Sequence, residues 1–423
     1  MVGILFYDVR ITKNILQTLQ ERLIYWGIKM LIIYSEDMHE IFFYSTIEIV
    51  RKNYLGRVLV LIPYNKFKKL GKSFFDLNQI EVFIIDYSKH YDFLKRISLT
   101  NKYIGYVEIL NVLFFKNYKR LFKRIEDIID HESELSFLAL ELYPIASNRL
   151  VRKLLDSIYF KSKTLFLHNI YGYKNTLINF DKSTLRKKLL YWLVNVSYKD
   201  EVKWFNNILV PMDYLVPEAQ REHRLDTYAF PLAIPSKVLL KKREYYLNFL
   251  NNEKLTFVVP GSVENFRRDY KKIIESFVGI DVAKYELVFL GKLIDNSLIS
   301  KCFELGVNLR YYKDYLSSED YENEFLKCNF AIYSPNLESG YGSRKISGTP
   351  SDAFRHGVPL INLSNEEFEN QFDIRTQDLK TFVETLIVDE FSYKEKYGFP
   401  ALNISINHDL NQYDDVIKRI IYQ

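Results

Sequence analysis

The chain has 423 residues, 48% of them hydrophobic and 26% charged, so it is a globular protein large enough for two or three domains. It has no uncharged apolar run of the about 18 residues that a membrane span needs, no evident secretory signal, and only two cysteines, Cys302 and Cys328, which excludes a disulfide scaffold or zinc ribbon; we expect a cytoplasmic protein. Residues 1–230 carry 34 Lys and Arg against 25 Asp and Glu, whereas the remainder carries 24 against 28, so we expect the first half to meet an anionic partner.

In the first half of the chain, short β-branched or aromatic runs alternate with longer helical patterns, which is typical of parallel α/β architecture. Helices are predicted at residues 12–26, 110–129 and 183–205. Strands are predicted at residues 3–7, 30–34, 57–62, 82–86, 135–141, 164–168 and 207–211.

The motif FPLAIPSK at 230–237 carries two prolines that a central strand would not accept, and the same alternation restarts after it. Strands are predicted at 255–259, 286–290, 308–312, 330–333 and 358–362, with helices at about 266–280, 294–305, 318–328 and 348–356. The sequence therefore predicts two Rossmann-like, doubly wound domains, at 1–233 and 234–404. A final helix, at about 405–423, is expected to pack back on the first domain.

The motif FVVPGSVENFRRDYKKIIESF joins an apolar strand to a helix that is expected to begin near Asn265. Gly261 allows a close backbone approach to a ligand, Ser262 follows it, and the helix N-terminus offers unpaired N–H groups. Arg267 and Arg268 add charges that suit a diphosphate. The pattern favours a diphosphate site; a tight turn followed by a solvated basic helix face is the alternative.

A second glycine-rich loop follows the strand at 330–333 and carries two cations, Arg344 and Lys345. The next helix is predicted to begin near Thr349, with Asp352 in its first turn. At the rim of a cleft this carboxylate would accept hydrogen bonds from two ribose hydroxyls; its alternative role is to complement the helix dipole.

Residues 255–362 resemble the donor domain of GT-B glycosyltransferases, in particular the retaining group related to glycogen synthase and bacterial mannosyltransferases (the family 4 type). The resemblance implies that a donor diphosphate is held at Gly261, Ser262, Arg267 and Arg268. It also implies that Asp352, which is followed by Ala353 and the motif GVPLI, binds the ribose. The first half resembles these enzymes in architecture only.

The chain departs from the family pattern at one acid. The family carries a second acid eight positions before the ribose-binding one, and here that position is Arg344. Either the loop variant with Lys345, Ser347 and Gly348 supplies cationic donor contacts, or Glu338 takes the place of the missing acid.

Three further residues are candidates because they stand at or near strand ends. His168 ends the strand of KTLFLHN and would bind the transferred sugar or the acceptor, as the resemblance also suggests; otherwise it is a hydrogen-bonded loop residue. Gly291 and Tyr312 would lie under the nucleotide base, or belong to ordinary sheet core.

The residues at 111–129 and 185–205 combine an aromatic stripe with many Lys and Arg. Such helices lie on anionic lipid headgroups or, alternatively, bury the stripe in the core of an α/β domain. With the basic first half, the pattern favours weak peripheral association with the inner face of a membrane.

These observations favour a glycosyltransferase that moves a sugar from a UDP- or GDP-linked donor to a glycan or lipid-linked acceptor. No D-x-D motif stands at a strand end, so we expect neither a metal nor a cofactor, and a retaining outcome follows from the resemblance. The alternative is a catalytically silent GT-B-like protein that binds a nucleotide sugar or partners a transferase. Nucleic-acid binding lacks a recognisable motif.

Overall fold

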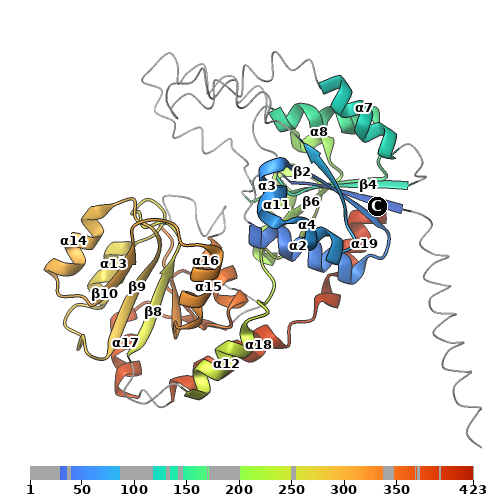
Figure 1. The fold of residues 1–423 in the computed structure, drawn as a ribbon. Coiled ribbons are helices and arrows are strands. Elements are labelled where there is room, and N and C mark those ends of the chain that lie inside the picture. The colour runs from blue at the N-terminus through green and yellow to red at the C-terminus, as the bar shows by residue number, and fades with distance from the viewer. Residues whose placement is uncertain are drawn as a thin grey trace, which may run out of the picture.

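The structure is a computed structural model of the 423-residue chain. It describes residues 29–35, 40–85, 118–129, 134–141, 146–168, 170, 201–248, 254–336, 347–366, 368, 372–389 and 392–422. The strand and helix predicted at 3–7 and 12–26, and most of the helix predicted at 183–205, lie outside these residues. Two parallel sheets organise the described chain (Figure 1).

The first sheet has seven parallel strands in the order β3-β2-β1-β4-β5-β6-β7. Its central strands are runs of Leu, Ile, Val and Phe, as expected for strands that are covered on both faces. The strands are β1 (Lys29–Tyr34), β2 (Arg57–Pro63), β3 (Glu81–Ile85), β4 (Glu134–Ala139), β5 (Ser162–Phe166), β6 (Asn207–Val210) and β7 (Asp226–Ala229).

Alternate residues of β1 enter two different cores, because successive side chains of a strand point to opposite faces. Leu31 and Ile33 face one core, and Met30 and Ile32 face the other. The first core is covered by α2 (Glu40–Asn53) and α19 (Asp414–Tyr422), the second by α7 (Tyr118–Ile129) and α8 (Ala146–Ser157). The remaining elements of this domain are α3 (Tyr64–Leu70), α4 (Lys72–Leu77), η2 (Glu201–Trp204), η3 (Asp213–Leu215) and α11 (Val216–His223).

The apolar stripe of α7 belongs to the core. Phe122, Ile125 and Ile129 are buried, and Lys123 and Arg124 are exposed beside them. The described part of this basic helix therefore packs its apolar face against the first sheet. Among the described residues, no helix combines the length and apolarity needed to cross a bilayer.

The second sheet has six parallel strands in the order β10-β9-β8-β11-β12-β13. They are β8 (Leu255–Pro260), β9 (Tyr285–Lys292), β10 (Leu309–Tyr312), β11 (Phe330–Tyr333), β12 (Leu360–Asn362) and β13 (Asp373–Arg375). The helices of this domain are α12 (Leu239–Asn248), α13 (Tyr270–Ser276), α14 (Asn296–Glu304), α15 (Ser318–Leu326), α16 (Gly348–Arg355), α17 (Leu379–Val388), η5 (Lys394–Gly398) and α18 (Phe399–Ile406).

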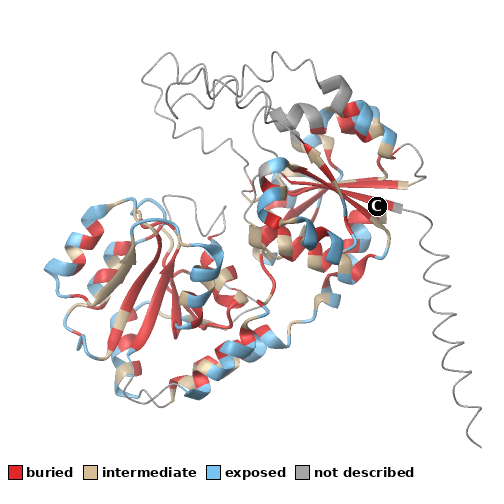
Figure 2. Cartoon of the chain, in the orientation of Figure 1, coloured by how far each residue is buried: buried red, intermediate tan, exposed pale blue. Residues whose placement is uncertain are grey.

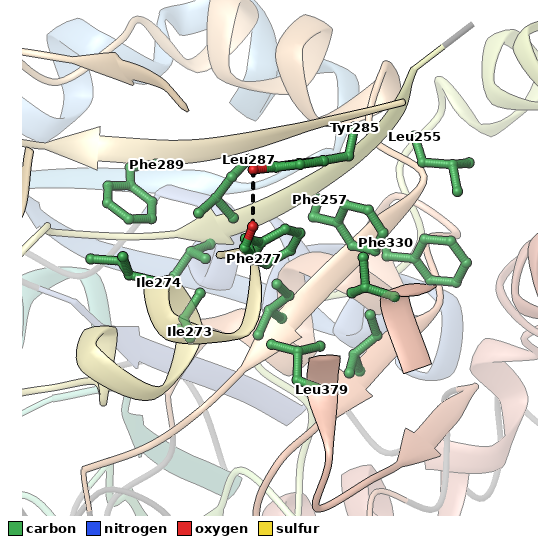
Figure 3. Close-up of a cluster of buried hydrophobic side chains, with 14 of the residues drawn as sticks. Leu255, Phe257, Ile273, Ile274, Phe277, Tyr285, Leu287, Phe289, Phe330 and Leu379 are labelled. Carbon is green, nitrogen blue, oxygen red and sulfur yellow. Dashed lines mark hydrogen bonds between the residues drawn. The ribbon is translucent and has the colours of Figure 1, made fainter. Parts of the chain in front are cut away.

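Buried side chains fill both faces of this sheet, as Figure 2 shows by the red strands between the helices. On one face, Phe257 stacks on Phe330 with ring centroids 5.4 Å apart. The hydroxyl of Tyr285 donates to the carbonyl of Phe277 at 3.3 Å, so a buried polar group finds its partner inside the core (Figure 3). The predicted pair of doubly wound α/β domains is confirmed.

The chain crosses between the two domains twice. At the first crossing, the amide of Ile234 donates to Ser45 Oγ in α2, and its carbonyl accepts from Arg355 in α16. At the second, Ser405 donates to the carbonyl of Phe354, and Asn53 donates to the carbonyl of Leu410. Beyond this crossing come η6 (Leu410–Tyr413) and α19, which packs against β4 and β5 of the first sheet.

Several element boundaries differ from the sequence-based expectations. The helix expected from about 266 begins at Tyr270, because Asp269 caps it by accepting from the amide of Lys272. The tail is not one helix from 405: α18 ends at Ile406 and α19 begins at Asp414, since the crossing lies between them. The short strands β7 and β13 were not predicted.

Candidate functional site

The strands β8 and β11 are neighbours at the centre of the second sheet. From β8 the chain continues to β9 and β10 on one side, and from β11 it continues to β12 and β13 on the other, so the strand order reverses between β8 and β11. In open parallel sheets, ligands bind beyond the carboxyl ends of the strands at this point. Here β8 runs into Gly261 and Ser262, and β11 runs into Ser334 and Pro335. The predicted first loop thus lies at the position where open parallel sheets commonly bind ligands.

Gly261 and Gly291 lie against each other at this point, and we call the group Gly261, Ser262, Arg268 and Thr349 the crevice. Gly261 has a φ of +94°, and a Cβ atom there would lie 2.5 Å from Nη2 of Arg268. A Cβ atom on Gly291 in β9 would lie 2.3 Å from the carbonyl oxygen of Gly261. Gly291, which was expected near a nucleotide base, therefore allows the Gly261 backbone to approach β9 closely.

Arg268 is the cation of the crevice. It is 9% exposed, and it donates to the carbonyl of Ser262 at 3.3 Å and to Oγ1 of Thr349 at 3.5 Å. Its backbone forms an antiparallel bridge with Pro335, which fixes it against the end of β11. No carboxylate of the described residues lies within ion-pair distance of its guanidinium.

Arg267 does not join Arg268 in the way the sequence motif suggested. Its Nε lies 2.7 Å from Glu264 Oε1, and its side chain is 45% exposed. Arg267 ends the turn at 265–267 and is exposed, whereas Arg268, at the bridge to Pro335, is buried.

The N-terminus of α16 forms the opposite wall. Ser347 is the N-cap and accepts from the amide of Thr349 at 3.2 Å; its hydroxyl is 3.1 Å from that of Thr349. Gly348 is the first helical residue. The positive end of the helix dipole and the Arg268 guanidinium thus meet at Thr349, which favours an anion. Glu338, Arg344 and Lys345 lie outside the described residues.

Asp352 is the fifth residue of α16, so it lies one position beyond the first turn and the predicted first-turn position was wrong. The reason is that the helix begins at Gly348 rather than near Thr349–Pro350. Its carboxylate accepts a 2.8 Å hydrogen bond from the hydroxyl of Tyr321 in α15. Burial raises the pKa of Asp352 to about 6, against the opposing effects of that hydrogen bond and the charges of Arg355 and Arg268.

Tyr315 joins the site without having been predicted. It follows β10, its ring is 69% exposed, and its hydroxyl is 3.4 Å from Oγ of Ser262. Lys292 Nζ lies 5.8 Å from the ring centroid. Tyr312, the expected neighbour of a base, instead accepts from Arg310 within the edge of the sheet. An aromatic residue just past a strand end was the available signal for Tyr315.

Glu366 is a second residue that the sequence analysis missed. It follows β12, and its Oε2 accepts from the hydroxyl of Tyr333 at 2.8 Å and from that of Tyr214 at 3.4 Å. Tyr333 ends β11, whereas Tyr214 belongs to η3 of the first domain. Burial raises the pKa of Glu366 to about 7, assisted by the charge of Asp373. Nothing in the local sequence marks this pairing, because its partners are far apart in the chain.

A cavity of about 330 Å³ lies between the two domains. It is lined by the segment after β6, the first crossing, α16 and the second crossing, including Met212, Asp213, Ala233, Ser351, Phe354 and His408. His168 lies beyond β5 in the first domain, where its ring contacts those of Phe42 and Phe166 at centroid distances of 5.5 and 4.8 Å.

The fold resembles solved structures of glycosyltransferases along most of the chain. The Escherichia coli structure described as trehalose-6-phosphate bound with UDP-2-fluoro glucose has a TM-score of 0.56 at 8% identity, covering 93% of this chain and 99% of that one. WaaG, a glycosyltransferase involved in lipopolysaccharide biosynthesis, gives 0.55 at 10% identity, with 93% and 99% covered. HepE of Anabaena, in complex with UDP-glucose, gives 0.51 at 11% identity, with 92% and 98% covered.

No protein-family model matches the sequence, and a search of curated proteins gives no match. At identities of 8–11%, the likeness to the solved structures is one of fold.

Proposed function

Since the chain has the GT-B fold, we propose that it is a glycosyltransferase that moves a sugar from a nucleoside-diphosphate sugar to a glycan or lipid-linked acceptor. The second domain would hold the donor, and the first would receive the acceptor. Closure of the domains would exclude water and so limit hydrolysis of the donor.

The observation that carries this proposal is the environment of Arg268. A buried guanidinium costs free energy unless an anion compensates it, and no described carboxylate pairs with this one. It faces the Gly261 backbone and the N-terminus of α16, both of which suit phosphate oxygens. A diphosphate bound there would complete the charge balance of the crevice.

The nucleoside would extend from the diphosphate between Ser262, Tyr315 and Asp352. Asp352 would accept hydrogen bonds from the ribose hydroxyls, either in place of the hydrogen bond from Tyr321 or in addition to it. The exposed ring of Tyr315 would offer an aromatic face to the base. The HepE structures and the Escherichia coli structure hold UDP, UDP-glucose or UDP-2-fluoro glucose, which favours a uridine donor over a guanosine one.

The transferred sugar would lie toward the first domain. Arg344 and Lys345 would stabilise the charge that develops on the departing diphosphate, which is the work a divalent cation does in other transferases. We propose a metal-independent, retaining transfer on this basis, with Glu338 or His168 contacting the sugar. The basic first half would attract an anionic acceptor and favour weak association with an anionic membrane surface.

The first test is thermal unfolding of the purified chain with UDP, GDP and their sugars, without added metal. Ligand at about 100 times its Kd should add about 2.7 kcal/mol to the free energy of unfolding. Arg268→Gln should lower uridine-diphosphate affinity at least about tenfold, because it removes a buried charged contact.

The neighbouring Arg267→Gln is the matched control and should bind normally, since that side chain faces Glu264. The two variants should unfold at similar denaturant concentrations. Equal binding by both variants would contradict the site. Binding without any turnover would favour the catalytically silent alternative, which the arginine in place of an acid at position 344 supports.

A further inference from the structure

The carboxylate of Glu366 joins the two domains through hydroxyl groups alone. Its Oε2 accepts from Tyr333 in its own domain and from Tyr214 in the other. The ring of Tyr214 also lies 6.3 Å from that of Phe368, so apolar packing accompanies the hydrogen bond. Both tyrosines use the same oxygen, and Oε1 has no hydrogen-bond partner among the described residues.

The groups around this carboxylate are mostly neutral or negative. Asp373 on β13 is the nearby charge that disfavours ionisation of Glu366, and Arg375 pairs with Asp373 at 3.5 Å. Burial raises the pKa values of Tyr214 and Tyr333, so both remain hydroxyl donors at neutral pH. With no described cation paired to it, Glu366 depends on these two hydroxyls for its hydrogen bonds.

The contact lies beyond the carboxyl ends of strands in both sheets. Tyr214 follows the carboxyl end of β6, and Glu366 follows that of β12. Tyr333 is followed by Ser334, whose carbonyl accepts from the amide of Asp269 next to Arg268. Tyr333 and Ser334 therefore connect Glu366 to the backbone next to Arg268.

From this geometry we infer that Glu366 is a positioning residue: by accepting from Tyr214, it sets how closely the first domain sits over the donor crevice. The inference rests on the proposed function only in naming what the crevice holds. The domain contact itself is independent of any ligand.

The test measures the distance between the domains in the full-length chain, without nucleotide. Cysteines introduced as Leu77→Cys on α4 and Phe303→Cys on α14 would carry spin labels, since these side chains are 83% and 61% exposed. The native Cys302 and Cys328 are buried and should remain unlabelled. Double electron–electron resonance then reports the distribution of separations.

Tyr214→Phe keeps the ring packed on Phe368 and removes only the donor, so it should raise the population of longer distances about fivefold. Glu366→Leu should do the same, and the double variant should separate the domains no further, because both changes remove the same interdomain hydrogen bond. Glu366→Gln keeps a carbonyl acceptor and should resemble the native chain. Tyr159→Phe, an exposed tyrosine of the first domain, is the matched control.

A distance distribution of Tyr214→Phe that superimposes on the native one would overturn the inference, as would additive effects in the double variant. Kinetics separate this result from the proposed function. Tyr214→Phe should lower kcat for sugar transfer while the Kd for nucleoside diphosphate stays unchanged. A chain that binds no nucleotide but opens on Tyr214→Phe would refute the proposed donor site and leave the domain contact intact.

Discussion

At the scale of single residues, alanine substitutions at Gly291 and Gly306 distinguish the cost of a steric clash from the cost of backbone strain. Gly291→Ala would place a Cβ atom against the Gly261 carbonyl, and a backbone atom cannot turn aside as a flexible side chain can. We expect a loss of at least about 3 kcal/mol in the free energy of unfolding, measured by urea titration.

Gly306→Ala is the comparison for that variant. Gly306 has a φ of +67°, with nothing within 4 Å of the added carbon, so its variant carries strain without a clash. We expect a cost of about 1 kcal/mol. Equal losses for the two variants would mean that the approach of Gly261 to β9 is not what requires the glycine.

Asp352 should make the stability of the protein depend on pH. Its pKa is raised from 3.8 to about 6, so the folded state holds a proton that the unfolded state has lost between these values. The contribution of Asp352 to the free energy of unfolding therefore falls by up to about 3 kcal/mol as pH rises from about 4 to 6. Above that pH it no longer changes. Asp352→Asn cannot ionise and should lose this part of the pH dependence.

Chemical denaturation of both proteins at pH 4, 5, 6 and 7 checks this expectation. Glu366, whose pKa is also raised, titrates in both proteins, so the difference between the two curves isolates Asp352. Parallel curves across the whole range would show that Asp352 is not buried in solution as it is in the structure.

The sequence predicted part of the site and missed part of it. Gly261 and Arg268 were found because a strand, a glycine and a cation stand close together in the chain. Which of two adjacent arginines is buried depends on the bridge between Arg268 and Pro335, which are far apart in the chain. The pairing of Glu366 with Tyr214 spans 152 positions, so no local pattern could reveal it.

At the scale of elements, α19 belongs to the first domain although it ends the chain. Ile417, Ile420 and Ile421 are buried in the core that also holds Leu31 and Ile33, and Ser136 of β4 donates to the carbonyl of Ile421. The helix thus closes one face of the first sheet, and the sheet would expose apolar surface without it.

Ile420→Ala should therefore destabilise the first domain by about 2–5 kcal/mol. Hydrogen exchange should quicken in β4 and β5 and remain unchanged in β8 and β9. Ile404→Ala, at a 40% exposed position on α18, is the control and should cost much less. Faster exchange in both sheets would indicate that the domains unfold as one unit.

The central strands were all predicted, whereas two of the four edge strands, β7 and β13, were missed for a physical reason. A central parallel strand is covered on both faces and reads as an apolar run, as in β8, whose six residues are all buried. In contrast, β7 (Asp226–Ala229) has one buried residue of four, and β13 (Asp373–Arg375) has none of three. Their pairing comes from neighbouring strands, which a single sequence does not display.

At the scale of the whole molecule, the path of the chain makes the two domains unequal. The second domain is one continuous stretch between the crossings, whereas the first is completed by η6 and α19 from the end of the chain. Residues 235–407 alone should fold cooperatively and keep the nucleoside-diphosphate affinity proposed above. Residues 1–234 alone should expose the apolar face that α19 covers, and aggregate or remain partly unfolded.

Circular dichroism, thermal unfolding and nucleotide titration of the two fragments check this expectation. Adding residues 408–423 as a separate peptide should restore cooperative unfolding to the first fragment, and the same peptide with Ile417 and Ile420 changed to Ser should not. A stable first fragment without the peptide would show that α19 is dispensable for that domain.

The two crossings also have a kinematic consequence. Ile234 is tied to Ser45 on one side and to Arg355 on the other, and the second crossing is tied through Ser405 and Leu410. A body anchored at two points can rotate about the line that joins them, but it cannot twist across that line or slide along it. Opening of the two domains should thus be a rotation about one axis. This rotation moves the carboxyl ends of β6 and β12 apart along a single arc and brings them back to the same relative position on closing.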